Sequence, residues 1–232
     1  MPYRRLPKTD AARLKALKVL LENPDLYAAR SRFIAWKSLN EAQPAYDRLL
    51  TAHEQYKNAL RAQVRGSLKL DALQRRATMY ASHFLQVLFM AVERGEIKRR
   101  SLSLYGLDEQ SLCLPNIKTI EGLEEWTRKI AEGEKARVSS GGRPIYNPTV
   151  SMVLTHYDIY REAAQRQQLL TDRTSRALAE VQRLRPQTDA IILDIWNQVE
   201  KHYETEPASV RFDACRKFGI IYYYRKNEPH EL

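Results

Sequence analysis

Basic side chains recur at a regular spacing in the first half of this 232-residue sequence. Lys57, Arg61 and Arg65 are four residues apart, so on a helix they form one row. Such a row can neutralise the phosphates of a nucleic acid or the carboxylates of a protein partner. The aromatic residues nearby fall on the apolar side of the same helix, which favours a solvated flank over a base-stacking groove. The basic character continues at Lys69, Arg76, Arg99 and Arg100.

The net charge of +10 comes from one part of the chain. The first hundred residues contain 20 Lys and Arg against 9 Asp and Glu, whereas the remainder contain 18 against 19. This asymmetry indicates an acidic protein partner or a nucleic acid bound without sequence preference. No helix-turn-helix, zinc-finger or RNA-binding signature is recognisable, so a sequence-specific class is not indicated.

A second candidate for anion binding is the glycine pair that precedes Arg143. A phosphate loop needs consecutive backbone N–H donors that lead directly into a helix. Pro144 removes one donor, and four residues separate Gly142 from Asn147, the expected cap of the next helix. The phosphate-loop and dinucleotide fingerprints are absent. The segment is therefore predicted to connect two helices, with Arg143 kept as a candidate to hold an anion near the helix start.

His53 shares an apolar stripe with tyrosines and is the candidate for acid–base chemistry. A pocket formed by His53, Tyr56, Tyr157 and Tyr160 would place an imidazole in the interior of a bundle. The alternative is a buried histidine that bonds to a tyrosine and sets the helix register. The second interpretation is favoured because every buried polar group needs a partner. No catalytic residue is assigned, since no nucleophile, histidine and acid can be grouped from the sequence.

Metal and cofactor sites are not predicted. Di-iron bundles use a Glu three residues before a His, and no His in this sequence has an acidic residue at that position. The two cysteines, Cys113 and Cys215, are far apart, which suggests neither a disulfide framework nor a zinc site. Lys15 and Lys18 interrupt any signal-peptide core, and the most apolar stretch is too short to cross a bilayer. We therefore expect a cytoplasmic protein with no membrane contact.

Two segments show the clearest helical pattern. Apolar and aromatic residues alternate at spacings of three and four over 46–60 and again over 70–91, as in helices of antiparallel bundles. Pro44 is expected at the start of the first helix and Gly95 at the end of the second. Gly66 between them indicates either a kink or a tight connection. Further helices are predicted near 9–22, 24–39, 119–138, 148–184 and, after a break or kink at Pro186, to about 203.

The segment 220–224 is β-like because it carries consecutive tyrosines after two isoleucines. A lone strand would leave an exposed edge, so we expect it to pair with 101–105, which alternates with period two. The sequence thus predicts an all-α fold, an antiparallel bundle of four or five long helices with a minor two-stranded β element, as a single domain over 1–232. The polar middle of 148–184 is either buried as a polar layer or projects from the bundle.

These observations favour a non-enzymatic interaction or scaffold protein that meets an acidic protein partner or a second copy of itself. A nonspecific nucleic-acid-binding protein is the alternative, because the basic charge would serve it equally well. A small-molecule-binding protein or enzyme with a pocket around His53 is the third class considered.

Overall fold

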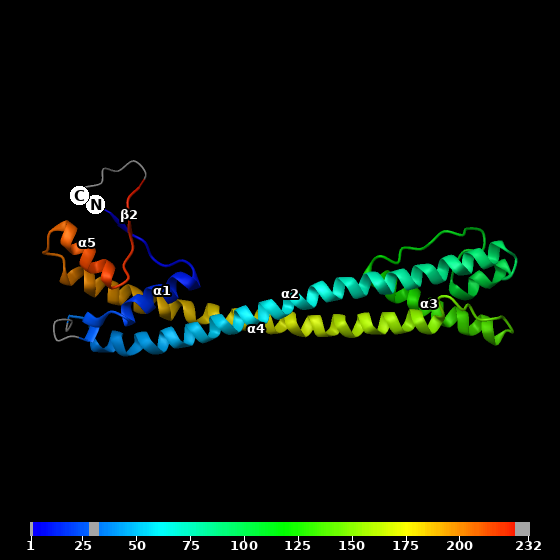
Figure 1. Ribbon diagram of the computed structural model, residues 1–232, viewed down its shortest axis with the longest axis horizontal. Coiled ribbons are helices and arrows are strands. Elements are labelled where there is room, and N and C mark those ends of the chain that lie inside the picture. Colours follow the sequence, from blue (N-terminus) through cyan, green and yellow to red (C-terminus); the bar gives the residue numbers. More distant parts are fainter. Residues whose placement is uncertain (1, 28–32, 226–232) are drawn as a thin grey trace. The chain divides into compact units, whose positions relative to one another are not determined.

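The computed structural model describes residues 2–27 and 33–225, and within them the prediction of an all-α fold with a minor β element is confirmed. Figure 1 shows the elements along the chain. In order they are β1 (Tyr3–Arg4), α1 (Asp10–Leu21), η1 (Pro24–Tyr27), α2 (Trp36–Glu93), η3 (Arg99–Tyr105), α3 (Ile120–Ser139), α4 (Val150–His202), α5 (Ala208–Lys217) and β2 (Tyr222–Tyr223).

The chain divides into two compact units. Unit 1 comprises Met1–Leu60 and Arg173–Leu232, and unit 2 comprises Arg61–Asp172. The long helices α2 and α4 therefore contribute one part to each unit. The single domain over 1–232 stays a prediction.

Unit 1 is an antiparallel arrangement in which α1 packs on the first part of α2 and the last part of α4. Ser38 at the start of α2 donates to Asp194 Oδ2 near the end of α4 at 2.6 Å, while Ala52 further along α2 clusters with Val181. Thr9 caps α1 because its Oγ1 accepts from the Ala12 N–H at 3.2 Å. The fully buried side chains include Leu17, Leu20, Leu49, Ile195, Trp196 and Phe218.

Unit 2 repeats the antiparallel pairing with the other parts of the same two helices. Gln167 Nε2 donates to the Gln63 carbonyl at 3.1 Å, and the Tyr80 ring stacks on His156 with centroids 4.0 Å apart. α3 and η3 complete the unit and contribute to one apolar cluster with α2 and α4. Its most buried members include Ala81, Phe84, Leu85, Leu88, Leu102, Tyr105, Leu123, Ile130 and Val153.

Three residues predicted at helix boundaries lie inside helices. Pro44 does not begin a helix, because α2 already begins at Trp36. The buried neighbours Ala42 and Ala45 belong to the unit 1 core, and their packing outweighs a proline cost of about 3 kcal/mol. Gly66 is not a connection either, because α2 continues through it, and a Cβ there would meet Leu170 at 2.9 Å. Glycine at this position lets α2 approach α4 closely.

Pro186 does not end its helix, and α4 continues to His202. The residues on either side of this proline bind α1: Arg185 pairs with Asp10, and Asp189 pairs with Arg13. These contacts stabilise the helix where the proline removes one backbone hydrogen bond.

The polar middle of α4 faces inward instead of projecting from its unit. Gln167 is half-buried against α2, and Thr171 Oγ1 donates to the Gln167 carbonyl at 3.1 Å. Thr174 is buried. The sequence pattern left both alternatives open, and the hydrogen bond from Gln167 to Gln63 decides between them.

The predicted partner of the C-terminal strand is wrong. β2 pairs antiparallel with β1, with Tyr3 opposite Tyr223 and Arg4 opposite Tyr222. Residues 101–105 form part of the 3₁₀ helix η3 instead. The buried residues of this short helix are Leu102 and Tyr105, three apart as one side of a 3₁₀ helix requires, while Leu104 of the apparent alternation is 43% exposed.

The prediction that the glycine-containing segment connects two helices is confirmed. α3 ends at Ser139 and α4 begins at Val150. Thr149, and not Asn147, supplies the cap, because its Oγ1 accepts from the Met152 N–H at 3.2 Å.

Candidate functional site

The predicted basic row lies on the surface of α2 and is divided between the two units. Lys57 belongs to unit 1, whereas Arg61, Arg65 and Lys69 belong to unit 2. All four side chains are exposed. Among the described residues, none of them has a hydrogen-bonding or ion-pair partner, so their charges are available to an incoming group.

Two exposed apolar side chains lie beside this row on the outward side of α2. Val64 is 53% exposed and Leu68 is 69% exposed. At 100° per residue, both point away from Leu70 and Leu73, which pack into the unit 2 core. We call the exposed strip formed by Arg61, Val64, Arg65, Leu68 and Lys69 the α2 ridge. Sequence reasoning found its cations but did not single out its apolar residues.

Arg76 lies apart from the ridge. The pKa of His156 on α4 is lowered by burial and, to a smaller extent, by the charge of Arg76, so Arg76 lies beside the α4 side of α2. The structure does not join it to Arg61 and Arg65 in one row.

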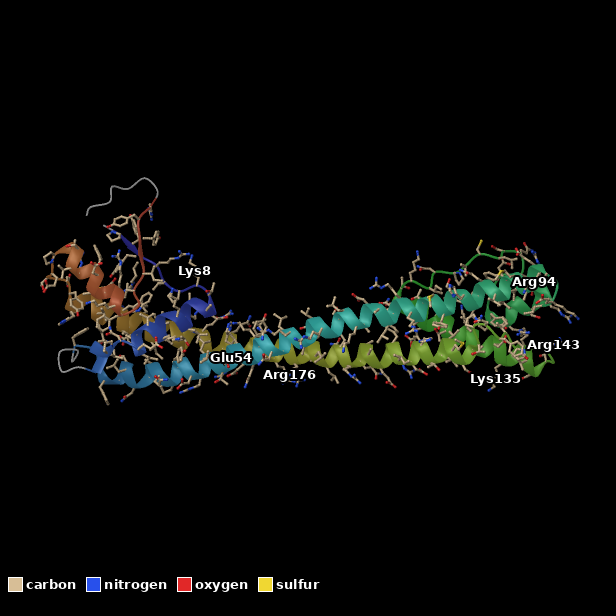
Figure 2. All side chains as sticks on the ribbon, in the orientation of Figure 1. Lys8, Glu54, Arg94, Lys135, Arg143 and Arg176 are labelled. Atoms are coloured by element: carbon tan, nitrogen blue, oxygen red, sulfur yellow. The ribbon has the colours of Figure 1, made fainter. Side chains whose placement is uncertain are left out.

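A second basic surface is a cleft at the end of unit 2 that we call the end cleft. It has a volume of about 1150 Å³ and is lined by the end of α2, by η3 and by the connector between α3 and α4. Arg100 and Arg143, which are far apart in the sequence, both line it, while Arg99 does not. Figure 2 shows Arg94 and Arg143 at this same end of the unit.

The charged side chains of the end cleft fall into two groups. Arg94 is neutralised by Glu96, with Nε 2.8 Å from Oε1, and the buried Arg137 is paired with Glu134. Lys98, Arg100 and Arg143 are exposed and have no side-chain partner among the described residues. The unpaired carboxylate at the cleft is Glu109, so positive charge exceeds negative charge.

Behind the end cleft lies a buried polar cluster that sequence reasoning missed. Arg137 Nη2 bonds to Glu134 Oε1 at 2.8 Å and Oε2 at 2.7 Å, and Tyr105 donates its hydroxyl to the same carboxylate. The Ile145 N–H donates to Glu134 Oε1 at 2.7 Å. Burial raises the pKa of Tyr105, and the hydrogen bond to Glu134 adds to that increase. The sequence signal was only a Glu and an Arg three residues apart, a spacing shared by many exposed pairs.

The four residues of the predicted pocket around His53 are divided between the two units. His53 and Tyr56 belong to unit 1, where Tyr56 packs against Leu49 and Val181. Tyr157 and Tyr160 belong to unit 2 and contact each other, with ring centroids 6.2 Å apart. Burial raises the pKa of both unit 2 tyrosines.

The expected tyrosine partner of His53 is also missing from the described residues. Its Nδ1 is buried without a hydrogen bond. The charged group it influences is Asp10, whose pKa is lowered mainly by hydrogen bonds from Arg185 and, as the smallest contribution, by His53.

Residues 2–27 and 33–225 lack two further features. No group of three His, Cys, Asp or Glu side chains gathers there in a way that would hold a metal ion. No helix in those ranges has both the length and the apolar run needed to cross a membrane.

The end cleft and the α2 ridge are thus two surfaces in the described part of unit 2 where unpaired cations gather. Comparison of the chain with protein-family models, with curated proteins and with solved structures finds no match.

Proposed function

We propose that this chain is a non-enzymatic interaction protein that binds an acidic amphipathic helix of another protein along the α2 ridge. One observation carries the proposal. Exposed Val64 and Leu68 lie beside the row of unpaired cations Arg61, Arg65 and Lys69 on one helix surface. An apolar stripe with a charged border is the surface that an amphipathic helix recognises.

The charge of the ridge defines the chemistry of its partner. A helix that buries Val64 and Leu68 must place its own flanking residues near Arg61 and Arg65, and acidic residues are favoured there. Two copies of the ridge would bring like charges together, so self-association would need a different surface. The proposal includes the cytoplasmic location that the sequence predicts.

A nucleic acid remains the second candidate because exposed, unpaired cations also attract phosphates. The protein helix and the nucleic acid differ in how much the apolar residues Val64 and Leu68 would contribute to binding. Nonspecific binding to a phosphate backbone depends on charge and salt, whereas a protein helix also gains free energy from burying Val64 and Leu68.

The experiment compares two labelled probes by fluorescence anisotropy across a salt series. One probe is a designed amphipathic peptide with a leucine stripe bordered by glutamates, and the other is a random-sequence single-stranded oligonucleotide. The test variants are Val64→Ser with Leu68→Ser, and Arg61→Glu with Arg65→Glu. Lys118→Glu with Lys135→Glu changes the net charge equally, on exposed residues of unit 2 outside α2.

The proposal expects both ridge variants to weaken peptide binding by about tenfold or more, which corresponds to about 1.4 kcal/mol. The Lys118 and Lys135 control should leave peptide binding nearly unchanged. Tighter binding of the oligonucleotide, lost in the charge variant and kept in the serine variant, would replace the proposal by the nucleic-acid function. Equal weakening by the control would reduce the ridge to a solvated flank.

A further inference from the structure

We propose that the end cleft of unit 2 binds a small organic polyanion of the phosphate-ester class, one that joins several phosphate oxygens to an apolar or aromatic body. This site is independent of the α2 ridge. Its volume of about 1150 Å³ is at the upper end of what small-molecule sites occupy. The volume alone does not identify the ligand, so the class of ligand is inferred from the residues that line the cleft.

The positive charge of the end cleft comes from two separate chain segments. Lys98 and Arg100 lie where the chain leaves α2 and enters η3, while Arg143 lies on the connector before α4. The fold brings these side chains around one concave surface. A ligand with several anionic oxygens can contact both segments at once, and guanidinium groups bind phosphate oxygens in pairs.

Arg143 lies on a segment whose backbone is fixed on both sides. The Gly142 N–H donates to the Arg137 carbonyl at 3.0 Å, and the Ile145 N–H donates to Glu134 Oε1 at 2.7 Å. The buried Arg137–Glu134 pair therefore holds the connector in place. Because this segment is ordered before any ligand arrives, less conformational entropy is lost on binding.

The Lys98 and Arg100 segment is also held by backbone hydrogen bonds. The Glu96 and Ile97 N–H groups both donate to the Ala91 carbonyl, at 2.9 and 3.2 Å, and the Ser101 N–H donates to the Lys98 carbonyl at 2.9 Å. Both cationic segments thus have a defined position relative to α2 within the same unit.

The rest of the lining is apolar and explains why the ligand needs a body as well as phosphates. Val87, Ala91 and Ile97 form part of the wall, together with the exposed Leu104 and Tyr146. An aromatic ring or a short aliphatic group would cover these side chains. Ser103 and Ser140 already donate their hydroxyls to backbone carbonyls, so the cations are the main polar recognition groups.

Glu109 is the opposing charge at the cleft. One carboxylate against three unpaired cations leaves an excess of positive charge at the site. Glu109 would repel a phosphate placed beside it, so phosphate groups are expected at the Lys98, Arg100 and Arg143 side.

The test titrates ATP, inorganic triphosphate and adenosine into the full chain and follows binding by calorimetry at low salt. The variants are Arg100→Ala with Arg143→Ala, and Leu104→Ser alone. The control is Arg99→Ala with Lys135→Ala, which removes two exposed cations of unit 2 that do not line the cleft. Circular dichroism of each variant checks that the helices are retained.

ATP is expected to bind, triphosphate to bind more weakly and adenosine not to bind. The Arg100 and Arg143 variant should weaken ATP binding by about tenfold or more, and the control should change it less than about twofold. Leu104→Ser should weaken ATP binding but leave triphosphate binding unchanged. That last contrast separates an apolar wall from a purely electrostatic surface.

Three results would overturn the proposal. The first is no heat of binding with ATP at about 5 mM, beyond the weakest useful affinity. The second is an equal loss in the control variant, which would show general attraction to a basic protein. The third is tighter binding of a hexaglutamate peptide that Arg100→Ala with Arg143→Ala abolishes, since the cleft would then take an acidic protein segment. None of these results depends on the α2 ridge, so each proposal can fail alone.

Discussion

The two units hold their helices together with polar contacts of opposite character. In unit 1, α1 is bound to α4 by two ion pairs near the surface: Arg185 with Asp10 and Asp189 with Arg13. The Arg185 and Asp189 side chains are 34% and 42% exposed, whereas their partners Asp10 and Arg13 are 12% and 10% exposed. In unit 2, Glu134 and Arg137 are each 7% exposed and share their hydrogen bonds with Tyr105 and the Ile145 N–H.

The difference teaches where a single substitution will be costly. A pair with one partly exposed partner loses less when that pair is broken, because water can solvate part of the remaining charge. A buried pair that loses one partner leaves an uncompensated charge and several unpaired hydrogen-bonding groups. The buried cluster of unit 2 therefore depends on the Glu134 carboxylate. In unit 1 the polar contacts are divided between two separate ion pairs.

The largest effect is expected for Glu134→Ala. This change strands the buried Arg137 guanidinium and removes the acceptor for Tyr105 and the Ile145 N–H, and should cost about 3–5 kcal/mol of unfolding free energy. Urea unfolding followed by the fluorescence of Trp126, which packs on the unit 2 core, measures it.

Two further variants serve as comparisons for Glu134→Ala. Glu132→Ala removes an exposed carboxylate on the same helix and should cost less than about 0.5 kcal/mol. Glu134→Leu with Arg137→Met should cost less than Glu134→Ala, since no buried charge is left unpaired. Equal losses for Glu132→Ala and Glu134→Ala would contradict the contrast between the two units.

Gly133→Ala tests how tightly the buried cluster is packed. A Cβ at this position would contact the Tyr105 ring and come within 3.0 Å of the Leu104 carbonyl oxygen. We expect a loss of about 1–3 kcal/mol from overpacking, even though alanine is the better helix former. Thermal unfolding of this variant is compared with Lys135→Ala, an exposed neighbour on α3. A stabilised Gly133→Ala protein would show that η3 moves freely away from α3.

Asp10→Asn removes the charge that pairs with Arg185 in unit 1. It should lower the unfolding free energy by about 1–2 kcal/mol at neutral pH. The pKa of Asp10 is held below its ordinary value, chiefly by the hydrogen bonds from Arg185. A carboxylate with a lowered pKa stabilises the fold above its unfolded-state pKa, and that stability is lost as pH falls through the lower folded-state value.

The unfolding free energy is measured as a function of pH from the fluorescence of Trp196, which is buried in unit 1. This measurement tests the predicted loss of stability in acid. The wild type should lose stability as pH falls below about 4, and Asp10→Asn should lose less over the same interval. A steeper acid loss in the variant would be inconsistent with the lowered pKa.

The smallest effect is expected for Tyr222→Phe in β2. The Tyr222 hydroxyl donates to Glu200 Oε1 at 2.7 Å, but Arg4 also pairs with Glu200 at 2.7 Å. The carboxylate keeps a partner, so the loss should be about 1 kcal/mol or less. Tyr223→Phe, at the neighbouring exposed position, is the matched control in a urea titration. A loss as large as that of Glu134→Ala would remove the distinction between the units.

The same tryptophans test the predicted single domain. A variant that keeps only Trp126 reports on unit 2, and one that keeps only Trp196 reports on unit 1. One coincident transition in urea supports a single domain over 1–232. Two separate midpoints would show that the units unfold independently.

Helix content was predictable because the apolar spacing of α2 and α4 is regular over many turns. The boundaries at Pro44, Gly66 and Pro186 were not, since tertiary packing offsets the local preference of each residue. The partner of β2 was missed for a related reason. Two residues near the N-terminus, Tyr3 and Arg4, are too few to give a strand pattern.

The candidate site was predictable only in part. Unpaired cations such as Arg61, Arg65 and Arg143 can be read from composition and spacing. Which of them share a surface depends on contacts far apart in the chain, and the pairing of Arg143 with Arg100 in one cleft leaves no local signal. The Glu134–Arg137 pair illustrates the same limit, because its burial comes from η3 and the connector rather than from its own helix.

The division of the chain also sets an order of events during synthesis. Unit 2 is one continuous stretch, whereas unit 1 is assembled from two stretches that flank it. A ribosome synthesises every residue of unit 2 before it makes Ile191, Ile195 or Trp196, which complete the core around Leu17 and Leu20. The first sixty residues are therefore made long before the residues that complete their core. Unit 2 is the part whose residues are all present first, and so the part able to fold first.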